Sequence, residues 1–236
     1  VDPQRLAVLL LVAASLAVCA LASVSLTSPD PEAVTLFDRL HWTVSYVTAP
    51  ILAWLGISRQ WPLPRWIALF LPAVFSGYAF LHAQPLGHPF AQWGALGWLA
   101  IFVTHFSLLR IAEPQRHTAI EWLHGGACWA LALLFAWELN WQVAERTTGV
   151  WASLAWGFAP AFLLAWLGQR QLRPRWPVAQ HHVGYRMVGA APIAVALGIW
   201  IVMINLSSTG DPAWLPYLPL LNPLDVCVAL TLAALA

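Results

Sequence analysis

The chain has 236 residues, 60% of them hydrophobic and only 9% charged, and its mean hydropathy is +0.69. In soluble domains about a quarter of the residues are charged, so this composition excludes a surface that is mostly in contact with water. Eleven basic residues, all of them arginine, nearly balance ten acidic ones, which excludes the basic footprint of a nucleic-acid-binding protein.

About eight apolar runs follow one another along the chain, each long enough to cross a hydrocarbon core of about 30 Å as a helix of about 20 residues. The runs are continuous and do not alternate with a period of two, which indicates helices. They lie near residues 6–26, 37–57, 64–82, 91–110, 118–141, 149–168, 184–206 and 216–236. The predicted fold class is therefore all-α, a polytopic transmembrane helical bundle of about eight spans.

The arginines predict the orientation of these spans, because loops that cross the membrane are poor in positive charge. If the N-terminus is cytoplasmic, only Arg39 and Arg146 fall on the outer side, and the other nine arginines fall on the cytoplasmic side. We expect a multi-pass membrane protein with a cytoplasmic N-terminus. The first run is long enough to favour an anchor over a cleaved signal. Because the chain begins with valine and ends inside an apolar run, we expect it to be a piece of a longer protein.

A repeated stretch predicts the domain organisation. Residues 52–66 read LAWLGISRQWPLPRW and residues 164–176 read LAWLGQRQLRPRW, and in the predicted topology both end a span on the cytoplasmic face. Four spans separate the copies, so the repeats are predicted to be parallel, with four helices each. Residues 1–35 are then the tail of a preceding repeat, 36–148 one complete repeat, and 149–236 a truncated second one. The alternative is a coincidence between Leu-rich and Trp-rich helix ends.

Three short motifs add a family resemblance. They are His41-Trp42 at the start of a span, Trp137-Glu138-Leu139 at the end of another, and PYLPLLNPLD at residues 216–225. With the parallel repeats and the abundant tryptophan, these motifs resemble the bacterial predicted membrane proteins grouped as domain of unknown function 2339. The resemblance implies a larger, many-span inner-membrane protein, and it assigns neither an activity nor a catalytic residue.

Ionisable side chains inside spans are costly, so they are the first candidates for a functional site. On the predicted cytoplasmic side, antiparallel pairing of two spans places His105 at the depth of Glu121, and Glu121 and His124 share one helical face. Glu-x-x-His is half of a di-metal motif, although the chain offers no second half, and it also suits a proton relay. The neighbouring Gly125-Gly126 favours a third interpretation, an interhelical packing pair.

A second group of candidates lies on the predicted outer side. It includes Asp38, Arg39 and His41 at the start of one span, Glu138 and Asn140 near the end of another, Asn205 within a third, and Asn222 with Asp225 at the start of the last. Asn-Pro-Leu-Asp is a favourable helix start, because proline fits the first turn and an acid suits the helix dipole. We therefore weigh a structural role against a polar pocket that opens to the outside.

The remaining reactive side chains give weaker signals. Cys19, Cys128 and Cys227 lie in apolar runs, so we expect small apolar fillers and neither a disulfide nor a metal site. His181-His182 falls in an Arg-rich cytoplasmic loop, where solvation or contact with lipid headgroups is expected instead of metal binding. No nucleotide-binding loop or hydrolase motif occurs, and no cofactor is predicted.

Three functions fit these patterns. The first is a non-catalytic, transporter-like or conduit component with a polar crevice between the repeats. The second is a membrane-embedded enzyme that acts on a lipid-linked or envelope substrate, and the third is a structural scaffold. The expected partners are membrane lipids and the remaining spans of a longer protein or other membrane subunits, and nucleic acid is not expected.

Overall fold

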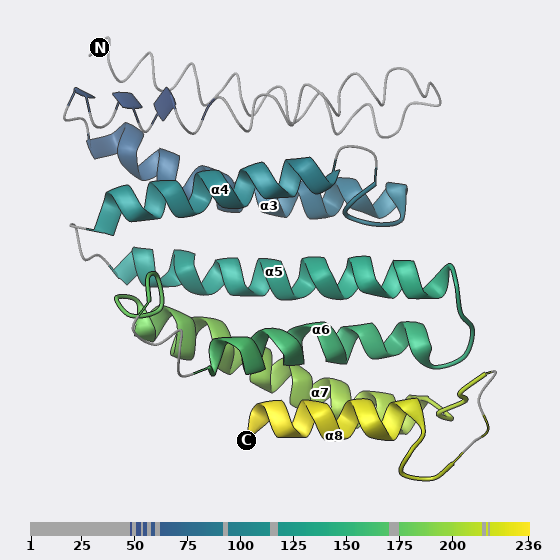
Figure 1. Ribbon diagram of the computed structural model, residues 1–236. Coiled ribbons are helices and arrows are strands. Elements are labelled where there is room, and N and C mark those ends of the chain that lie inside the picture. The colour runs from purple at the N-terminus through teal and green to yellow at the C-terminus, as the bar shows by residue number, and fades with distance from the viewer. Residues whose placement is uncertain are drawn as a thin grey trace, which may run out of the picture. The chain divides into compact units, whose positions relative to one another are not determined.

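A computed structural model describes most of the chain from residue 62 onward. The described residues are 48, 51–52, 54–55, 58–59, 62–91, 94–113, 118–169, 175–213, 216 and 218–236. Every regular element among them is a helix (Figure 1). The chain divides into two compact units between Arg116 and His117, and each unit is described by itself.

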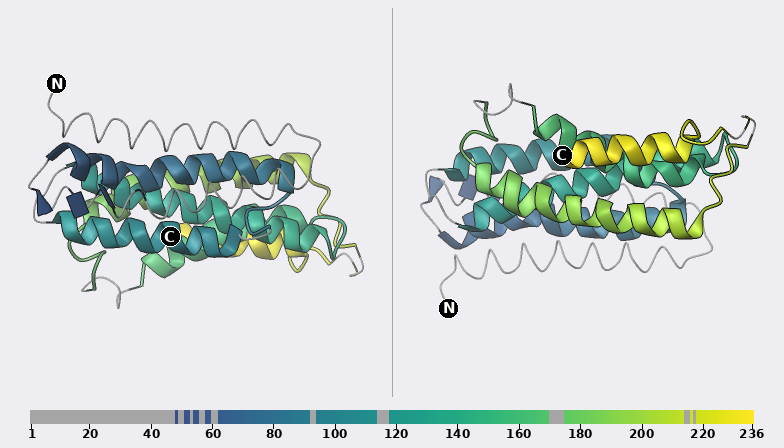
Figure 2. Two further views of the ribbon diagram at one scale, coloured as in Figure 1. Left: turned by 90° about the horizontal axis from the view of Figure 1, so that it is seen from above. Right: turned by 90° about the horizontal axis from the view of Figure 1, so that it is seen from below.

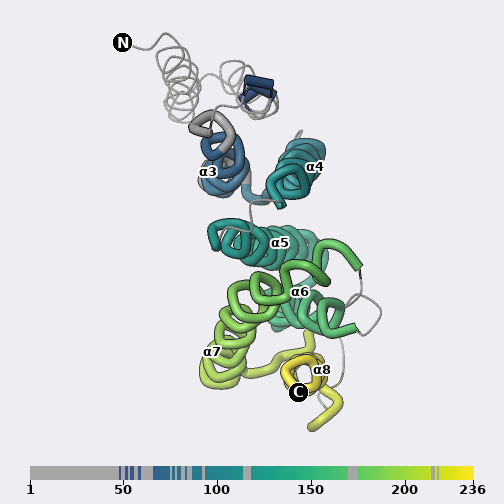
Figure 3. Tube along the Cα trace, turned by 90° about the vertical axis from the view of Figure 1, so that its left-hand side faces the viewer, coloured from purple at the N-terminus to yellow at the C-terminus, as the bar shows by residue number. Residues whose placement is uncertain are grey.

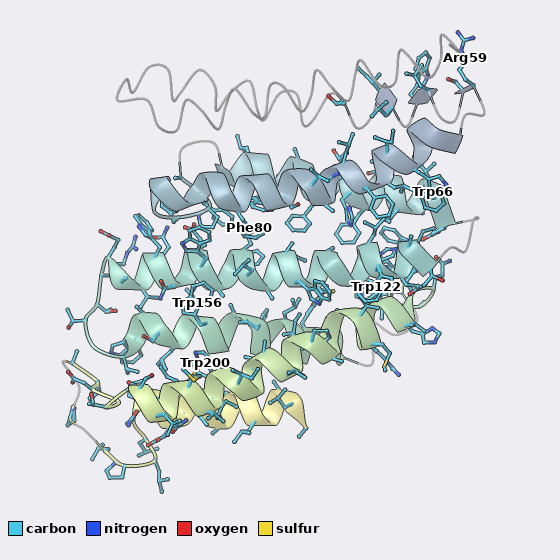
Figure 4. The ribbon with its side chains drawn as sticks, turned by 180° about the vertical axis from the view of Figure 1, so that it is seen from behind. Arg59, Trp66, Phe80, Trp122, Trp156 and Trp200 are labelled. Carbon is cyan, nitrogen blue, oxygen red and sulfur yellow. The ribbon has the colours of Figure 1, made fainter. Side chains whose placement is uncertain are left out.

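The first unit contains a helical hairpin. Helix α3 (Pro62–Leu86) and helix α4 (Gly94–Ala112) are joined by a turn at residues 87–91 and lie side by side when seen end-on (Figure 3). Trp98 of α4 is only 2% exposed, and its ring packs on Phe80 of α3 with the ring centroids 4.6 Å apart. Figure 4 labels Phe80 on α3.

The second unit is a bundle of long helices. Its elements are α5 (Thr118–Ala144), α6 (Trp151–Leu167), the π-helix η2 (Gly184–Ala190), α7 (Ala191–Ser207), which continues η2 directly, and α8 (Pro223–Leu235). Helix α6 contacts each of the others, and the helices run lengthwise past one another (Figure 2). At one end, the loops before α6 and after α7 are joined, because Val150 N–H donates to the carbonyl of Asp211.

The outward faces of several helices are apolar. Leu99 and Val103 on α4 and Val195, Ile199 and Leu206 on α7 are each more than half exposed. Such contiguous apolar exposure is rare on a surface that faces water. Three helices are long and apolar enough to cross a membrane, namely α4, α5 and the continuous helix Gly184–Ser207, while α6 and α8 are apolar but shorter. The polypeptide is therefore built as a membrane protein.

Helices occupy the positions of the predicted runs from the third onward. Six predicted runs coincide with α3, α4, α5, α6, η2 with α7, and α8, whereas the runs near 6–26 and 37–57 lie largely outside the described residues. Helix α8 begins at Pro223 and not near residue 216, because residues 218–222 form a turn in which Leu220 has φ +67°. The total of eight spans and the tandem repeat stay predictions.

Candidate functional site

Glu121 stands in the first turn of α5, where its carboxylate joins two segments of the second unit. Its Oε1 lies 2.8 Å from Nδ1 of His181, in the segment between α6 and η2. Its Oε2 accepts a 2.6 Å hydrogen bond from the backbone N–H of Gly184, the first residue of η2. One carboxylate thus fixes both the incoming loop and the start of the next helix.

His124, one helical turn further along α5, extends the contact into the bundle. Its ring stacks on that of His181, with centroids 4.1 Å apart and an interplanar angle of 23°. Its Nδ1 lies 3.1 Å from the hydroxyl of Tyr185 on η2. Glu121, His124, His181 and Tyr185, which we call the acid–imidazole cluster, therefore form one continuous polar chain within an apolar bundle.

Close backbone approach makes this cluster possible. A Cβ on Gly184 would lie 2.7 Å from the backbone oxygen of Glu121, and a Cβ on Gly125 would lie 2.4 Å from a methyl of Val188. Glycine at both positions lets η2 lie directly against α5, as expected for small residues at helix contacts in membranes. The π-helix at residues 184–190 also points to a functional site, because π-helical turns occur often at functional sites.

The chemistry available to the cluster is proton exchange and hydrogen bonding. A carboxylate next to an imidazole can accept, hold or pass on a proton. Within the described part of the chain, no three His, Cys, Asp or Glu side chains are grouped so as to hold a metal ion. Cys128 lies one turn beyond His124 on α5 and is buried, as its interpretation as an apolar filler requires.

The structure brings together two of the residues predicted for the cytoplasmic-side site, Glu121 and His124. The third, His105, is buried in α4 of the first unit, so its predicted pairing with Glu121 stays a prediction. The prediction for His181 is wrong, because its side chain is buried and bonded to Glu121 instead of facing solvent. Its neighbour His182 is exposed, as expected.

Sequence patterns offered one signal that could have found His181. Glu121 is a carboxylate at the start of an apolar helix, and a half-buried acid calls for a donor from another segment. His181 lies only three residues before the run that begins at Gly184, so antiparallel packing places it near the same end of the bundle. Sequence spacing alone did not show whether the ring turns inward.

Glu138 lies at the other end of α5 and takes part in a ladder along that helix. Its Oε1 accepts a 2.7 Å hydrogen bond from Nε2 of Gln142, and Oε1 of Gln142 accepts one of 2.7 Å from Arg146. Each step spans four residues, one helical turn, so the three side chains support one another on one face of the helix.

Asn222 and Asp225 build the start of α8. Oδ1 of Asn222 accepts a 2.6 Å hydrogen bond from the N–H of Leu224, and Oδ2 of Asp225 accepts one of 3.0 Å from the N–H of Leu220. The predicted helix-start role is thus confirmed for this pair. Asp38 and His41 lie outside the described residues, and the outward-opening polar pocket stays a prediction.

Replacing the cap residue tests this assignment. Asn222→Ala removes the acceptor for the first free N–H groups of α8, and we expect it to lower the free energy of unfolding by about 1 kcal/mol, the usual cost of losing a cap. Thermal unfolding in detergent measures the loss. Asn205→Ala is the matched control, because exposed Asn205 bonds only to the carbonyl of Ile201 in its own helix. An equal loss in both variants would contradict the cap.

Two apolar grooves flank the middle of the bundle. The larger, of about 520 Å³, lies between α5, α6 and α7, and its walls include Trp129, Trp156 and Trp200 together with Pro160 and Pro192. Figure 4 shows Trp156 and Trp200 on the helices α6 and α7. The second, of about 460 Å³, lies between α5 and α6. The lining of both grooves suits hydrocarbon better than a polar solute.

Comparison with known proteins identifies a family for the chain. A family model described as "Predicted membrane protein (DUF2339)" matches residues 4–236, nearly the whole length. Comparisons with curated proteins and with solved structures gave no match. Together with the apolar helical bundle, the match shows that the chain belongs to the DUF2339 family of predicted membrane proteins.

Proposed function

We propose that the chain is a non-catalytic, transporter-like component of the bacterial inner membrane and that the acid–imidazole cluster is its working site. The observation that carries this proposal is the position of Glu121, whose carboxylate joins His181 and the N–H of Gly184 within an apolar bundle. Acidic and imidazole side chains within membrane spans are costly, and their common uses are proton relays and substrate pathways.

The topology of this component is part of the same proposal. It has about eight spans, a cytoplasmic N-terminus and two parallel four-helix repeats, divided at residues 35/36 and 148/149. A polar crevice between the repeats forms the path, and membrane lipids and further spans of a longer protein surround it. The positions of the arginines and the duplicated stretch at residues 52–66 and 164–176 support this arrangement.

A structural scaffold is the second candidate, and a specific observation favours it. Gly125 and Gly184 fit closely between α5 and η2, as they would if the polar cluster served only to hold these two helices together. Under this hypothesis, a variant that keeps the packing but removes the carboxylate charge retains full function.

Glu121→Gln separates the two candidates, because the amide keeps an acceptor for Gly184 N–H and nearly the same volume. In a strain without the native gene, we expect the variant to reach wild-type membrane levels but to restore no more function than the empty vector. Glu145→Gln is the control, since Glu145 is exposed. Full restoration by Glu121→Gln would overturn the transporter proposal in favour of the scaffold.

The same strains distinguish transport from catalysis. Mass spectrometry of lipids and envelope compounds compares the wild type, the deletion strain and the Glu121→Gln strain. A transporter changes the amount of a compound on each side of the membrane and leaves its covalent structure intact. Loss of a covalently distinct product in the deletion strain would contradict the non-catalytic proposal.

A further inference from the structure

We infer that the acid–imidazole cluster is a binding site for a single exchangeable proton, shared between Glu121 and the two stacked imidazoles of His181 and His124. The inference rests on the proposed function for its role in transport, while proton binding itself is tested independently below. It names the ligand of the site and the order in which its groups exchange that proton.

The charge of the cluster sets the number of protons. An ionised Glu121 with two neutral histidines gives the site a net charge of −1. One added proton makes the site neutral, because it bonds to an imidazole nitrogen and the resulting imidazolium is paired with the Glu121 carboxylate. The 2.8 Å separation of Oε1 and Nδ1 is the distance of a hydrogen bond along which that proton is shared.

A second proton is opposed by the stacked rings. The His124 and His181 centroids are 4.1 Å apart and the rings are nearly parallel, so two imidazolium ions would place like charges in contact. At this separation and in a poorly solvated site, like charges strongly disfavour each other's charged form. Charge on one ring of the stacked pair therefore opposes charge on the other.

The solvent exposure of the side chains indicates which group of the cluster meets water first. The side chain of Glu121 is 25% exposed and that of His181 is 8% exposed, whereas His124 is completely buried. Glu121 is thus the end of the chain that meets water, and the hydrogen bond between His124 and the Tyr185 hydroxyl is the inner end. The proton enters at the carboxylate and moves along the hydrogen bond to Nδ1 of His181.

The surrounding elements add few other charged or titratable groups. Within residues 151–167 of α6 and residues 191–207 of α7, the sequence contains no titratable side chain. Helix α5 contributes Cys128 in addition to Glu121 and His124, and it carries Glu138 toward its other end, while η2 contributes Tyr185 and the exposed Arg186. The loop contributes exposed His182 and exposed Arg175 beside His181. Glu121 is accordingly the acid that sets the charge of the site.

NMR of the histidine ring nitrogens tests the inference on the complete chain in lipid nanodiscs, with ¹⁵N-labelled histidine. Signals of His124 and His181 are assigned from His124→Gln and His181→Gln. Between about pH 8 and pH 5, where imidazoles titrate, we expect one of the two rings to show the imidazolium shift and the other to stay neutral. His182→Gln is the control and should leave both signals unchanged.

Removing the carboxylate provides the second part of the test. In Glu121→Gln we expect neither ring to show the imidazolium shift over the same pH range. If this variant does not fold, Glu121→Asp takes its place, and we expect a weaker imidazolium shift than in the wild type. Two neutral rings in the wild type, two independently charged rings, or an unchanged shift in the Glu121 variants would each overturn the inference.

The NMR experiment tests proton binding and the cellular experiment tests its use in transport, so either claim can be refuted without the other. Loss of function in Glu121→Gln without any imidazolium signal in the wild type would leave the transporter proposal standing and refute the proton as ligand. An imidazolium signal that depends on Glu121, combined with full function of Glu121→Gln, would support proton binding and refute its use in transport.

Discussion

Gly125→Ala is expected to destabilise the second unit by about 1 to 3 kcal/mol, the usual range for overpacking a close contact. The added Cβ would lie 2.4 and 2.6 Å from side-chain atoms of Val188 and 3.0 Å from the carbonyl oxygen of Gly184. Neither contact is relieved by rotating a long side chain, because Val188 is β-branched and the second partner is backbone. Helix η2 must move away from α5, and the hydrogen bond from Gly184 N–H to Glu121 lengthens.

The adjacent glycine supplies a matched control. A Cβ on Gly126 meets nothing within 4 Å, so Gly126→Ala carries the helix propensity of alanine without a clash. Alanine is favoured over glycine inside a helix by about 1 kcal/mol, so this variant should be as stable as the wild type or more stable. Thermal unfolding of the purified protein in detergent, followed by tryptophan fluorescence, measures both variants. Equal midpoints for the two would contradict the packing described for α5 and η2.

A second substitution tests whether the contact with Val188 causes the loss of stability. Val188→Ala removes the Cγ1 methyl, which would lie 2.4 Å from the new Cβ, but keeps the Cβ at 2.6 Å, so it should recover only part of the stability lost in Gly125→Ala. By itself, Val188→Ala leaves a small cavity and is expected to be mildly destabilising. Recovery in the double variant would assign the loss to this contact and not to the altered backbone of α5.

The glycine pair also shows how far the sequence could be interpreted. Gly125-Gly126 predicted close helix approach, and the prediction holds at Gly125 but not at Gly126, which has open space around it. Adjacent residues on a helix point about 100° apart, so one contact face includes only one of them. Which of the two faces the neighbour depends on the rotation of α5, and that rotation follows from packing between segments far apart in the chain.

Helix positions could be predicted because they depend on local composition. A run of about 20 apolar residues must satisfy its backbone internally in hydrocarbon, and a helix does so. The prediction failed at the start of α8, where the apolar residues Leu218, Leu220 and Leu221 form an exposed turn. Pro219 lies within that turn and Pro223 follows it, and proline lacks the N–H that an earlier helix start would require. The hydropathy of these leucines predicted a longer helix, because hydropathy does not depend on whether the residues form a turn.

The residues of the candidate site could also be predicted only where they depend on local sequence. Glu121 and His124 could be found because i and i+3 share a helical face, which is a property of one segment. The contact between Glu121 and His181 joins residues 60 positions apart, and hydropathy contains no signal for it. Asn222 and Asp225 were placed correctly at a helix start, because capping chemistry is again local.

His181→Ala is expected to lower the free energy of unfolding by about 2 kcal/mol, within the range measured for hydrogen bonds to charged groups. The variant removes the partner of Glu121 Oε1 and one face of the stack on His124. Breaking a fully buried pair costs about 3 to 5 kcal/mol. The expected loss is smaller here because the Glu121 side chain is 25% exposed and water can partly solvate the carboxylate.

A double-mutant cycle with Glu121→Gln isolates the pair. In the double variant no carboxylate is left without its imidazole, and the glutamine amide still accepts from Gly184 N–H, so the combined loss should be smaller than the sum by about 1 to 3 kcal/mol. Chemical or thermal unfolding in detergent measures all four proteins. His182→Ala, one residue away and exposed, should stay within about 0.5 kcal/mol of the wild type. Strictly additive losses would mean that Glu121 and His181 act separately, and the cluster would then have no shared proton to bind.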